Sequence, residues 1–245
     1  MTILVTGASG FLGSALLRQL NAAPVHYRTP RRLDADVIIH CAHDFGGGAF
    51  ARNMALAEAL VSARRVVYLS SCSAVPQARS EYGRTKYAIE RRFLEAGHTV
   101  VRPGLVIGPG GLFLRGAQAI RRSRFVPLVE HGRLLLPVVA LADLLAAFPA
   151  ILAQPGQSEW NLFQQVSQRD YIYAIHPAAR ILNVPTALAL VLLRLAGVLN
   201  LRLPVNRENL LGILDSQNLA FNSHLPQLIH QPRSVAKMVK EALEA

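Results

Sequence analysis

The sequence predicts an α/β protein whose core is a doubly wound parallel sheet, followed by a small, mostly helical lobe. Short apolar segments alternate with segments of helical spacing from residue 1 to about residue 108, and the first apolar segment leads directly into a glycine-rich loop. Hydrophobic residues make up 51% of the 245 residues and aromatic residues only 7%, which suits α/β architecture better than a β-sandwich. Alternating strands and helices form βαβ units with parallel strands and right-handed crossovers.

The elements of the first part follow one another in a regular order. Two runs, DVIIHC from Asp36 and RVVYL from Arg65, are almost continuously apolar, as expected for parallel strands buried on both faces. Ser80 is a typical N-cap, with Glu81 in the first turn of the next helix, and Gly97 ends that helix. Strands are therefore expected at 3–6, 25–28, 36–41, 65–69 and 98–102, and helices at 12–20, 51–64 and 81–96.

The regular alternation stops at Gly108. Over 138–165 we expect a strand, a helix and another strand that pack back on the first part. The segment 186–203 is strongly apolar, but Arg194 and Arg202 leave too short an uninterrupted stretch for a membrane span. A buried or interfacial helix is expected there.

The loop Thr6-Gly7-Ala8-Ser9-Gly10-Phe11-Leu12-Gly13 has glycines at the first, fourth and seventh positions of a G-x-x-G-x-x-G pattern. Gly7 permits a tight turn, Gly10 lets the backbone approach a pyrophosphate, and Gly13 lets the helix pack close to the strand. Because the helix begins within the loop, its free N–H groups and its dipole favour a bound phosphate. In this context the pattern predicts a Rossmann-type dinucleotide site formed by Gly7, Ser9, Gly10, Phe11, Leu12 and Gly13.

The same text, TGASGFLG, resembles the short-chain dehydrogenase/reductase superfamily, in particular its extended branch, the NAD-dependent epimerase/dehydratase family. The resemblance covers residues 1 to about 165 with motifs in the family's order, and the rest only loosely. It implies that residues 1–108 form a dinucleotide-binding Rossmann core and residues 109–245 a substrate-binding region. It also implies that a hydride moves between the substrate and the nicotinamide.

Tyr82 and Lys86 form a Y-x-x-x-K pattern on the helix that follows Ser80. Residues four apart lie on one face of a helix, so the ammonium can lower the pKa of the phenol. A phenolate accepts a proton from a substrate hydroxyl, and a phenol donates one to a carbonyl. By similarity to the family, Tyr82 is the catalytic acid/base and Lys86 its partner, which also bonds the ribose hydroxyls of the cofactor.

The third catalytic position lies in Ser70-Ser71-Cys72-Ser73, at the carboxyl end of a strand, where sites of α/β proteins gather. The family places a Ser or Thr there to bond the reacting oxygen. One alignment with the family's text selects Ser71, which we favour, another selects Cys72, and Ser73 is a third option. Sugar 4,6-dehydratases of the family carry Asp-Glu where this chain has Cys72-Ser73, so the resemblance argues against that reaction. Cys72 is either a second proton shuttle or, as we favour, a small buried residue.

Other parts of the sequence resemble further landmarks of the family. DVIIHCAH resembles DVVIHLAA, which implies that Cys41, Ala42 and His43 contact the cofactor. Asn53 stands where the family has an asparagine on the next helix. RPGLVIGP resembles the text that closes over the nicotinamide, which implies contacts from Pro103 and Val106.

The cofactor is expected to be NADP, with NAD as the alternative. An acidic residue at the end of the second strand would bind the ribose 2′-hydroxyl of NAD, but this chain has Tyr27-Arg28-Thr29-Pro30-Arg31-Arg32 there. Arg28 and Arg31 suit a 2′-phosphate through their charge and fork geometry, although a solvated basic loop would have the same sequence. Only a few residues separate this loop from Asp36, so the third strand of the family and the helix before it are expected to be lost. The sheet edge would then be short and the adenine pocket open.

The formal net charge is +11. Three kinds of partner fit this charge: an anionic small substrate, which we favour, an acidic lipid surface contacted peripherally, or nucleic acid. Nucleic acid is not expected, because the basic residues are scattered in pairs and triplets. Candidate ligands for a substrate phosphate are Arg115, Arg121, Arg133 and Arg207. No metal site is expected.

Two cysteines and the lack of a recognisable signal peptide indicate the cytoplasm. Related proteins dimerise through the helices that carry Asn53 and Tyr82, so a homodimer is expected. The sequence therefore predicts an NAD(P)-dependent epimerase or reductase, and the resemblance alone suggests a nucleotide-linked sugar as its substrate. Two alternatives remain: a reductase of a lipid or other non-sugar carbonyl, and a non-catalytic dinucleotide-binding scaffold or sensor.

Overall fold

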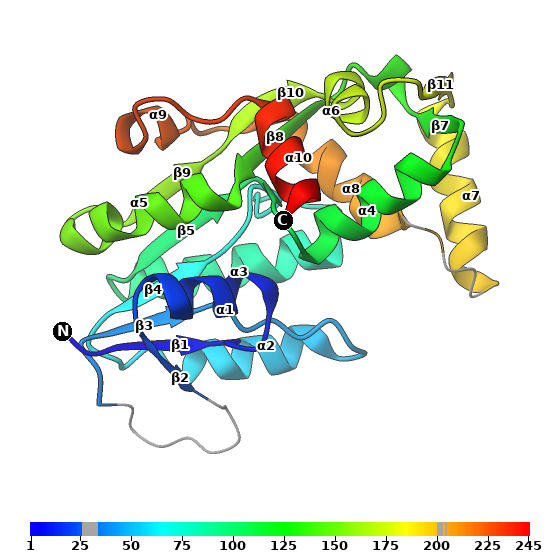
Figure 1. Cartoon of the computed structure of the whole chain (residues 1–245). Helices are drawn as coiled ribbons and strands as arrows, with labels where there is room; N and C mark the ends of the chain where they lie inside the picture. Colours follow the sequence, from blue (N-terminus) through cyan, green and yellow to red (C-terminus); the bar gives the residue numbers. More distant parts are fainter. Residues whose placement is uncertain (26–33, 200–202, 204) are drawn as a thin grey trace.

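The computed structural model describes residues 1–25, 34–199, 203 and 205–245 (Figure 1). Its centre is a six-stranded sheet in which every neighbouring pair is parallel. In spatial order the strands are β2 (Ala23–Val25), β1 (Ile3–Thr6), β3 (Val37–His40), β4 (Val66–Leu69), β5 (Thr99–Pro103) and β9 (Glu159–Leu162). This arrangement confirms the predicted α/β fold class.

Helices cover both faces of this sheet. The two on one face are α1 (Phe11–Gln19) and α5 (Leu141–Ala153), and the two on the other are α2 (Ala49–Glu58) and α3 (Glu81–Glu95). Leu16 and Phe148 lie in the hydrophobic core on the first face, and Ile89 and Phe93 in the core on the second. The strands β3 and β4 are buried along their whole length, as their apolar sequences predict.

Local signals set the ends of the helices. Ser80 is the N-cap of α3, and its side chain accepts a hydrogen bond from the amide of Gly83 over 3.1 Å. Gly97 follows the end of α3 with a φ of +78°, the left-handed conformation that glycine adopts without strain. Helix α2 ends at Glu58, six residues earlier than expected, because the chain turns there and buries Leu60.

Among the described residues, β2 forms one edge of the large sheet, next to β1. The segment expected to replace the lost third strand includes residues 26–33, which lie outside the described part of the chain. The shortened edge therefore stays a prediction.

The remaining elements form a second layered unit. Its strands are β6 (Leu105–Ile107), β8 (Leu135–Ala140) and β10 (Gln164–Ser167) in one sheet, and β7 (Phe125–Leu128) and β11 (Arg180–Asn183) in another. Its helices are α4 (Gly111–Arg122), α6 (Gln168–Ile175), α7 (Thr186–Val198), α8 (Arg207–Asp215), α9 (Leu225–Leu228) and α10 (Val235–Glu244), with short 3-10 turns at Glu130–Gly132 and Ser216–Asn218. A third hydrophobic core, which includes Phe113, Val138 and Ile172, holds β6, β7, β8, α4, α6 and α10 together, whereas Leu225 of α9 packs in the core of the large sheet.

The two units share elements, because the chain returns to the large sheet after residue 140. Helix α5 packs in the core of that sheet, and β9 pairs with β5 along Val100–Pro103. The boundary at residue 108 thus stays an interpretation of the sequence. Within the described ranges, no helix is both long and apolar enough to cross a membrane.

Candidate active site

The glycine loop packs against the chain that follows β3. Gly7 has a φ of +67°, and a Cβ atom there would lie 2.7 Å from the amide nitrogen of Ala42. A Cβ atom at Gly13 would lie 2.1 Å from the carbonyl oxygen of Gly7. Two of the three glycines are therefore required by close packing, which is the reason the sequence suggested for Gly13.

The N-terminus of α1 fits a pyrophosphate. Gly10 is its N-cap and offers no side chain to the first amides, so no side chain competes for them. Ser9 and Gly10 are exposed, whereas Phe11 and Leu12 are half-buried. The Phe11 ring packs against the loop before α4, where a Cβ atom at Gly110 would lie 2.7 Å from it.

Hydrogen bonds fix the chain after β3 beside the glycine loop. The amide of Cys41 donates to the carbonyl oxygen of Thr6 over 3.3 Å, and the amide of Ala42 donates to the Thr6 hydroxyl over 3.3 Å. That hydroxyl also bonds Nδ1 of His40 over 2.7 Å. Burial lowers the pKa of His40 to about 3, so its ring is neutral. The structure thus brings Cys41 and Ala42 to Gly7, as the dinucleotide prediction requires.

The Asn53 side chain fixes the backbone at Asp44, in the segment that follows β3. It accepts a hydrogen bond from the Asp44 amide over 2.8 Å and donates one to the Asp44 carbonyl over 2.9 Å. The Asp44 carboxylate bonds Arg52 and the amide of Gly46, and these bonds hold its pKa at about 2. Asn53 itself is 1% exposed. It therefore positions the loop from within rather than facing a ligand.

Tyr82 and Lys86 lie one above the other on α3. The Lys86 ammonium is 5.7 Å from the centroid of the Tyr82 ring and 4.7 Å from that of Tyr68. It donates a hydrogen bond to the carbonyl oxygen of Leu69 over 2.8 Å and is 3% exposed. Burial lowers the pKa of Lys86 to about 8.

The pKa of the Tyr82 phenol is raised rather than lowered, although Lys86 lies on the same face of α3. The pKa of Tyr82 is raised to about 12, because burial disfavours the phenolate more than the nearby Ser71 hydroxyl favours it. Tyr82 is thus protonated at neutral pH. In this form it donates a proton rather than accepting one.

An aromatic cluster joins Tyr82 to the glycine loop. His43 directly follows Ala42 in the sequence, and its ring lies edge-on to the Tyr82 ring, with centroids 5.0 Å apart. Phe45 stacks on Tyr82 with centroids 6.0 Å apart and an angle of 12° between the rings. Burial lowers the pKa of His43 to about 3. Its buried Nδ1 atom has no hydrogen-bond partner among the residues that the structure describes.

The four residues after β4 have different roles. Ser71 is half-buried, and its hydroxyl accepts a hydrogen bond from the amide of Ser73 over 3.1 Å. It also lies close enough to Tyr82 to favour the phenolate and so to lower the pKa of that phenol. Ser70 is buried and donates to Glu90. The Cys72 thiol is also buried and donates to the carbonyl oxygen of Arg102 over 3.7 Å, and burial raises its pKa.

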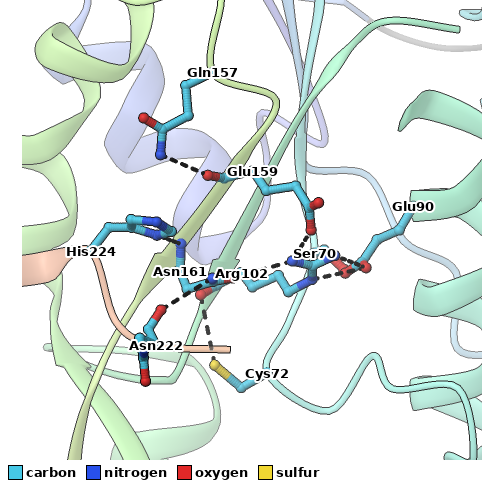
Figure 2. A network of polar contacts seen from close by, with 9 residues as sticks. All are labelled: Ser70, Cys72, Glu90, Arg102, Gln157, Glu159, Asn161, Asn222 and His224. Carbon is cyan, nitrogen blue, oxygen red and sulfur yellow. Dashed lines mark hydrogen bonds and ion pairs between the residues drawn. The ribbon is translucent and has the colours of Figure 1, made fainter. Parts of the chain in front are cut away.

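Figure 2 shows the buried network behind this serine loop. The Glu90 carboxylate accepts hydrogen bonds from Ser70 and from two nitrogens of Arg102, at 2.9 and 2.8 Å. Arg102 also bonds Glu159 over 2.6 Å and Asn161 over 3.2 Å. Glu159 and Asn161 line a hollow of about 680 Å³ along β9. In the sheet, β3, β4 and β5 lie between β9 and β1, the strand that leads into the glycine loop. The network thus supports the loop of Ser71 from the side of β5 and β9, which is away from the glycine loop.

Helix α8 braces the start of α3. The Asp215 carboxylate accepts hydrogen bonds from the amides of Arg79 and Ser80, over 2.9 and 3.2 Å, and from the Arg79 guanidinium. Glu208, at the other end of α8, accepts one from the amide of Glu81 over 2.6 Å. The helix of Tyr82 is thus held by the lobe expected to bind the substrate.

The other predicted residues are dispersed. Pro103 ends β5 and Val106 lies in β6, which pairs with β8. Arg28 and Arg31 lie outside the described residues. All four arginines proposed for a substrate phosphate are exposed: Arg115, Arg121, Arg133 and Arg207. Among the described residues, no cluster of three or more His, Cys, Asp or Glu side chains could hold a metal ion.

Three residues of the site were not predicted from the sequence. Phe45 stands alone before three glycines and is 79% exposed, a pattern that points to a loop but not to its contact with Tyr82. Glu90 follows Lys86 by four residues on the same helix face, and this spacing could have suggested it. Asp215 is far from Ser80 in the sequence, and nothing local indicates their contact.

No protein-family model and no curated protein sequence matches this chain. Solved structures do match it along almost their whole length. A dTDP-4-dehydrorhamnose reductase from Clostridium acetobutylicum is 16% identical, with a TM-score of 0.70 over 100% of this chain and 99% of that one. A UDP-glucuronic acid 4-epimerase from Bacillus cereus, in complex with NAD, is 17% identical, with a TM-score of 0.67 over 100% and 98%. The chain has the fold of these enzymes.

A dTDP-glucose 4,6-dehydratase from Bacillus anthracis, in complex with NAD, also shares the fold, with 13% identity and a TM-score of 0.69 over 100% of this chain and 96% of that one. The fold is thus common to NAD(P)-dependent reductases, epimerases and dehydratases. It does not support the exclusion of a dehydratase, which rests on Cys72 and Ser73 alone.

Proposed function

We propose that the protein is an NAD(P)-dependent oxidoreductase that reduces or epimerises a nucleotide-linked sugar. The observation that carries the proposal is the convergence of Tyr82, Lys86 and Ser71 at the glycine loop. Gly7 packs against Ala42, the His43 ring lies edge-on to the Tyr82 ring, and Ser71 lies close enough to Tyr82 to lower the pKa of its phenol. A proton donor, a cation and a hydroxyl are thus gathered where the fold binds a dinucleotide.

The residues divide the chemistry between them. A nicotinamide cofactor, when bound, supplies or accepts the hydride. In the reducing direction the protonated phenol of Tyr82 would give its proton to the oxygen of the substrate carbonyl as that carbonyl is reduced to an alcohol. The hydroxyl of Ser71 donates a hydrogen bond to the same oxygen. Lys86 stabilises the phenolate that remains until solvent returns the proton.

The N-terminus of α1 would hold the pyrophosphate through the amides after Gly10, and Lys86 would reach the ribose after release from Leu69. We favour NADP because of the charges of Arg28 and Arg31, with NAD as the alternative. Solved structures of this fold include one with NADP and others with NAD. Thermal shift with each dinucleotide tests the preference, and a larger shift with NAD would overturn it.

Substitution of Tyr82 tests the proposed chemistry. Tyr82→Phe removes the proton donor but keeps the ring against His43 and Phe45, so turnover is expected to fall by roughly 10²–10⁴-fold with dinucleotide binding unchanged. Tyr87→Phe, half-buried on the same helix, is the matched control and should keep full activity. The assay follows oxidation of the reduced dinucleotide with 4-keto nucleotide sugars. A Tyr82→Phe protein as active as the wild type would refute the role of Tyr82.

A second candidate is reduction of a lipid or other non-sugar carbonyl. It is favoured by the exposed apolar side chains of α7, since α7 contacts α8, and α8 in turn holds α3. Turnover of long-chain ketones but not of nucleotide sugars would select it. Dinucleotide binding without hydride exchange with either class would instead favour the scaffold alternative.

We further propose an anionic substrate, in keeping with the net charge of +11, and a homodimer formed through α2 and α3. Sedimentation of the free protein tests the dimer. A monomer at working concentrations would contradict it.

A further inference from the structure

Helix α7 presents a continuous apolar face away from the protein. Its exposed large side chains recur at the spacing of one helix face. They are Leu188, Val191, Leu192, Leu195, Val198 and Leu199, each 49% to 73% exposed, and we call this set the α7 outer face. Only Ala196 of this helix is buried. From the sequence, either a buried or an interfacial helix was expected in this segment. The exposure of α7 contradicts the first alternative.

The surroundings of α7 are strongly basic. Residues 104–129 and 171–199 contain no Asp or Glu, whereas they carry four and two arginines, respectively. The two segments lie side by side, because β7 and β11 pair in parallel and the amide of Arg180 donates to the carbonyl oxygen of Arg124 over 2.9 Å. Arg121, Arg122, Arg124 and Arg180 are all exposed. Figure 1 shows β7, β11 and α7 at the same side of the molecule.

The paired strands add apolar side chains to this surface. Phe125 of β7 is 46% exposed and Leu182 of β11 is 48% exposed. At the start of α7, the Glu130 carboxylate accepts a hydrogen bond from the Thr186 hydroxyl over 3.0 Å. Arg194, exposed on α7 itself, can extend its guanidinium from the apolar face toward phosphate groups.

We propose that the α7 outer face docks on the surface of an anionic lipid bilayer, with the arginines of β7, β11 and the end of α4 against the lipid phosphates. The 13 residues of α7 span about 20 Å, too short for a hydrocarbon core of about 30 Å, so the helix lies in the interface. An apolar helix face combined with clustered basic residues is the pattern of such peripheral binding.

Charge favours the bilayer over a second copy of the chain. A two-fold interface through α7 would place the same patch of each copy against the other. Two acid-free basic segments would then face each other, and like charges across an interface oppose association. An anionic bilayer instead neutralises them.

Vesicle cosedimentation of the whole protein tests this inference, independently of any enzymatic activity. We expect binding to vesicles of phosphatidylglycerol and phosphatidylcholine and little binding to phosphatidylcholine alone. Leu192→Asp with Leu195→Asp should weaken binding roughly tenfold or more, and so should Arg121→Glu with Arg122→Glu. The matched controls are Gln19→Asp with Gln154→Asp, which adds the same two negative charges elsewhere, and Arg18→Glu with Lys240→Glu. These four exposed residues lie outside the proposed docking surface and outside the proposed dimer helices, so both variants should bind like the wild type.

Circular dichroism checks that each variant is folded. As a second measurement, an environment-sensitive fluorophore at Val198→Cys should shift to the blue with anionic vesicles, whereas one at Phe50→Cys should not. Equal binding to both kinds of vesicle, no binding, or unchanged binding of the Leu192→Asp, Leu195→Asp protein would overturn the proposal. A dimer of the free protein that this double substitution dissociates would also overturn it, in favour of a second copy.

Discussion

Phe45 lies flat against Tyr82, with ring centroids 6.0 Å apart and an angle of 12° between the rings. The Phe45 ring is 79% exposed, so it covers Tyr82 without being covered itself. Asp44, which precedes it, is tied to Asn53 and Arg52, while Gly46, Gly47 and Gly48 follow it. The Phe45 ring thus lies over Tyr82, the proposed proton donor, between the fixed residue Asp44 and a run of three glycines.

Removing this ring should change the titration of Tyr82. Phe45→Ala admits water to the phenol, so the pKa of Tyr82 should fall from about 12 toward its ordinary value of 10.0. The measurement is an ultraviolet difference titration of Phe45→Ala with and without Tyr82→Phe. Phe50→Ala, at another exposed phenylalanine, is the control and should leave the titration as it is in the wild type. An unchanged Tyr82 pKa in Phe45→Ala would show that the ring does not exclude water.

Lys86 should give stability a specific dependence on pH. Its pKa is about 8 in the folded protein and 10.5 when unperturbed, so between these values the unfolded state binds more protons. The free energy of unfolding therefore gains a contribution that rises as pH increases from 8 to 10, by roughly 2–3 kcal/mol. Below pH 8 both states are protonated and the contribution is constant.

Lys86→Met should abolish this contribution. Urea unfolding at pH 8 and pH 10 measures the contribution. The slope compared between wild type and variant is the rise in the free energy of unfolding from pH 8 to pH 10. Lys237→Met, at an exposed lysine of α10, should keep the wild-type slope. Equal slopes for wild type and Lys86→Met would mean that the ammonium is not desolvated in solution.

Local sequence signals predicted the fold because the forces behind them are local. The apolar run at Val66–Leu69 fixes a buried strand, and Ser80 and Gly97 fix the ends of α3, whatever the rest of the chain does. The glycine spacing likewise predicts its loop, because Gly13 meets Gly7 within the same turn.

The electrostatics of the site could not be predicted in the same way. The spacing of Tyr82 and Lys86 places them on one helix face, but the pKa of each depends on burial by distant parts of the chain. Phe45 covers Tyr82, and the carbonyl of Leu69 holds Lys86. The exposure of α7 could not be predicted either, because an apolar sequence does not reveal whether other parts of the protein cover the helix.

The buried pair of Glu90 and Arg102 should be essential for stability. Glu90→Gln keeps the shape of the side chain but removes the charge that faces the guanidinium, so the free energy of unfolding should fall by about 3 kcal/mol. Arg102 keeps Glu159 as a partner, which limits the loss. Glu58→Gln is the control: Glu58 pairs with Arg92 at the surface, where solvent screens the pair, so its loss should cost far less stability than Glu90→Gln. Equal costs for the two variants, measured by urea unfolding, would contradict the buried role.

The glycines of the first loop should differ sharply from a glycine in open space. Gly13→Ala would bring a Cβ atom to 2.1 Å from the carbonyl oxygen of Gly7, so the turn must shift. We expect a loss of about 2 kcal/mol or more in stability and a weakened thermal shift with dinucleotide, because α1 and the loop move apart. Gly116→Ala, within α4, meets no atom within 4 Å and should stabilise the protein by roughly 0.5–1 kcal/mol. If Gly13→Ala retained both stability and dinucleotide binding, close packing of this loop would not be what the glycine is needed for.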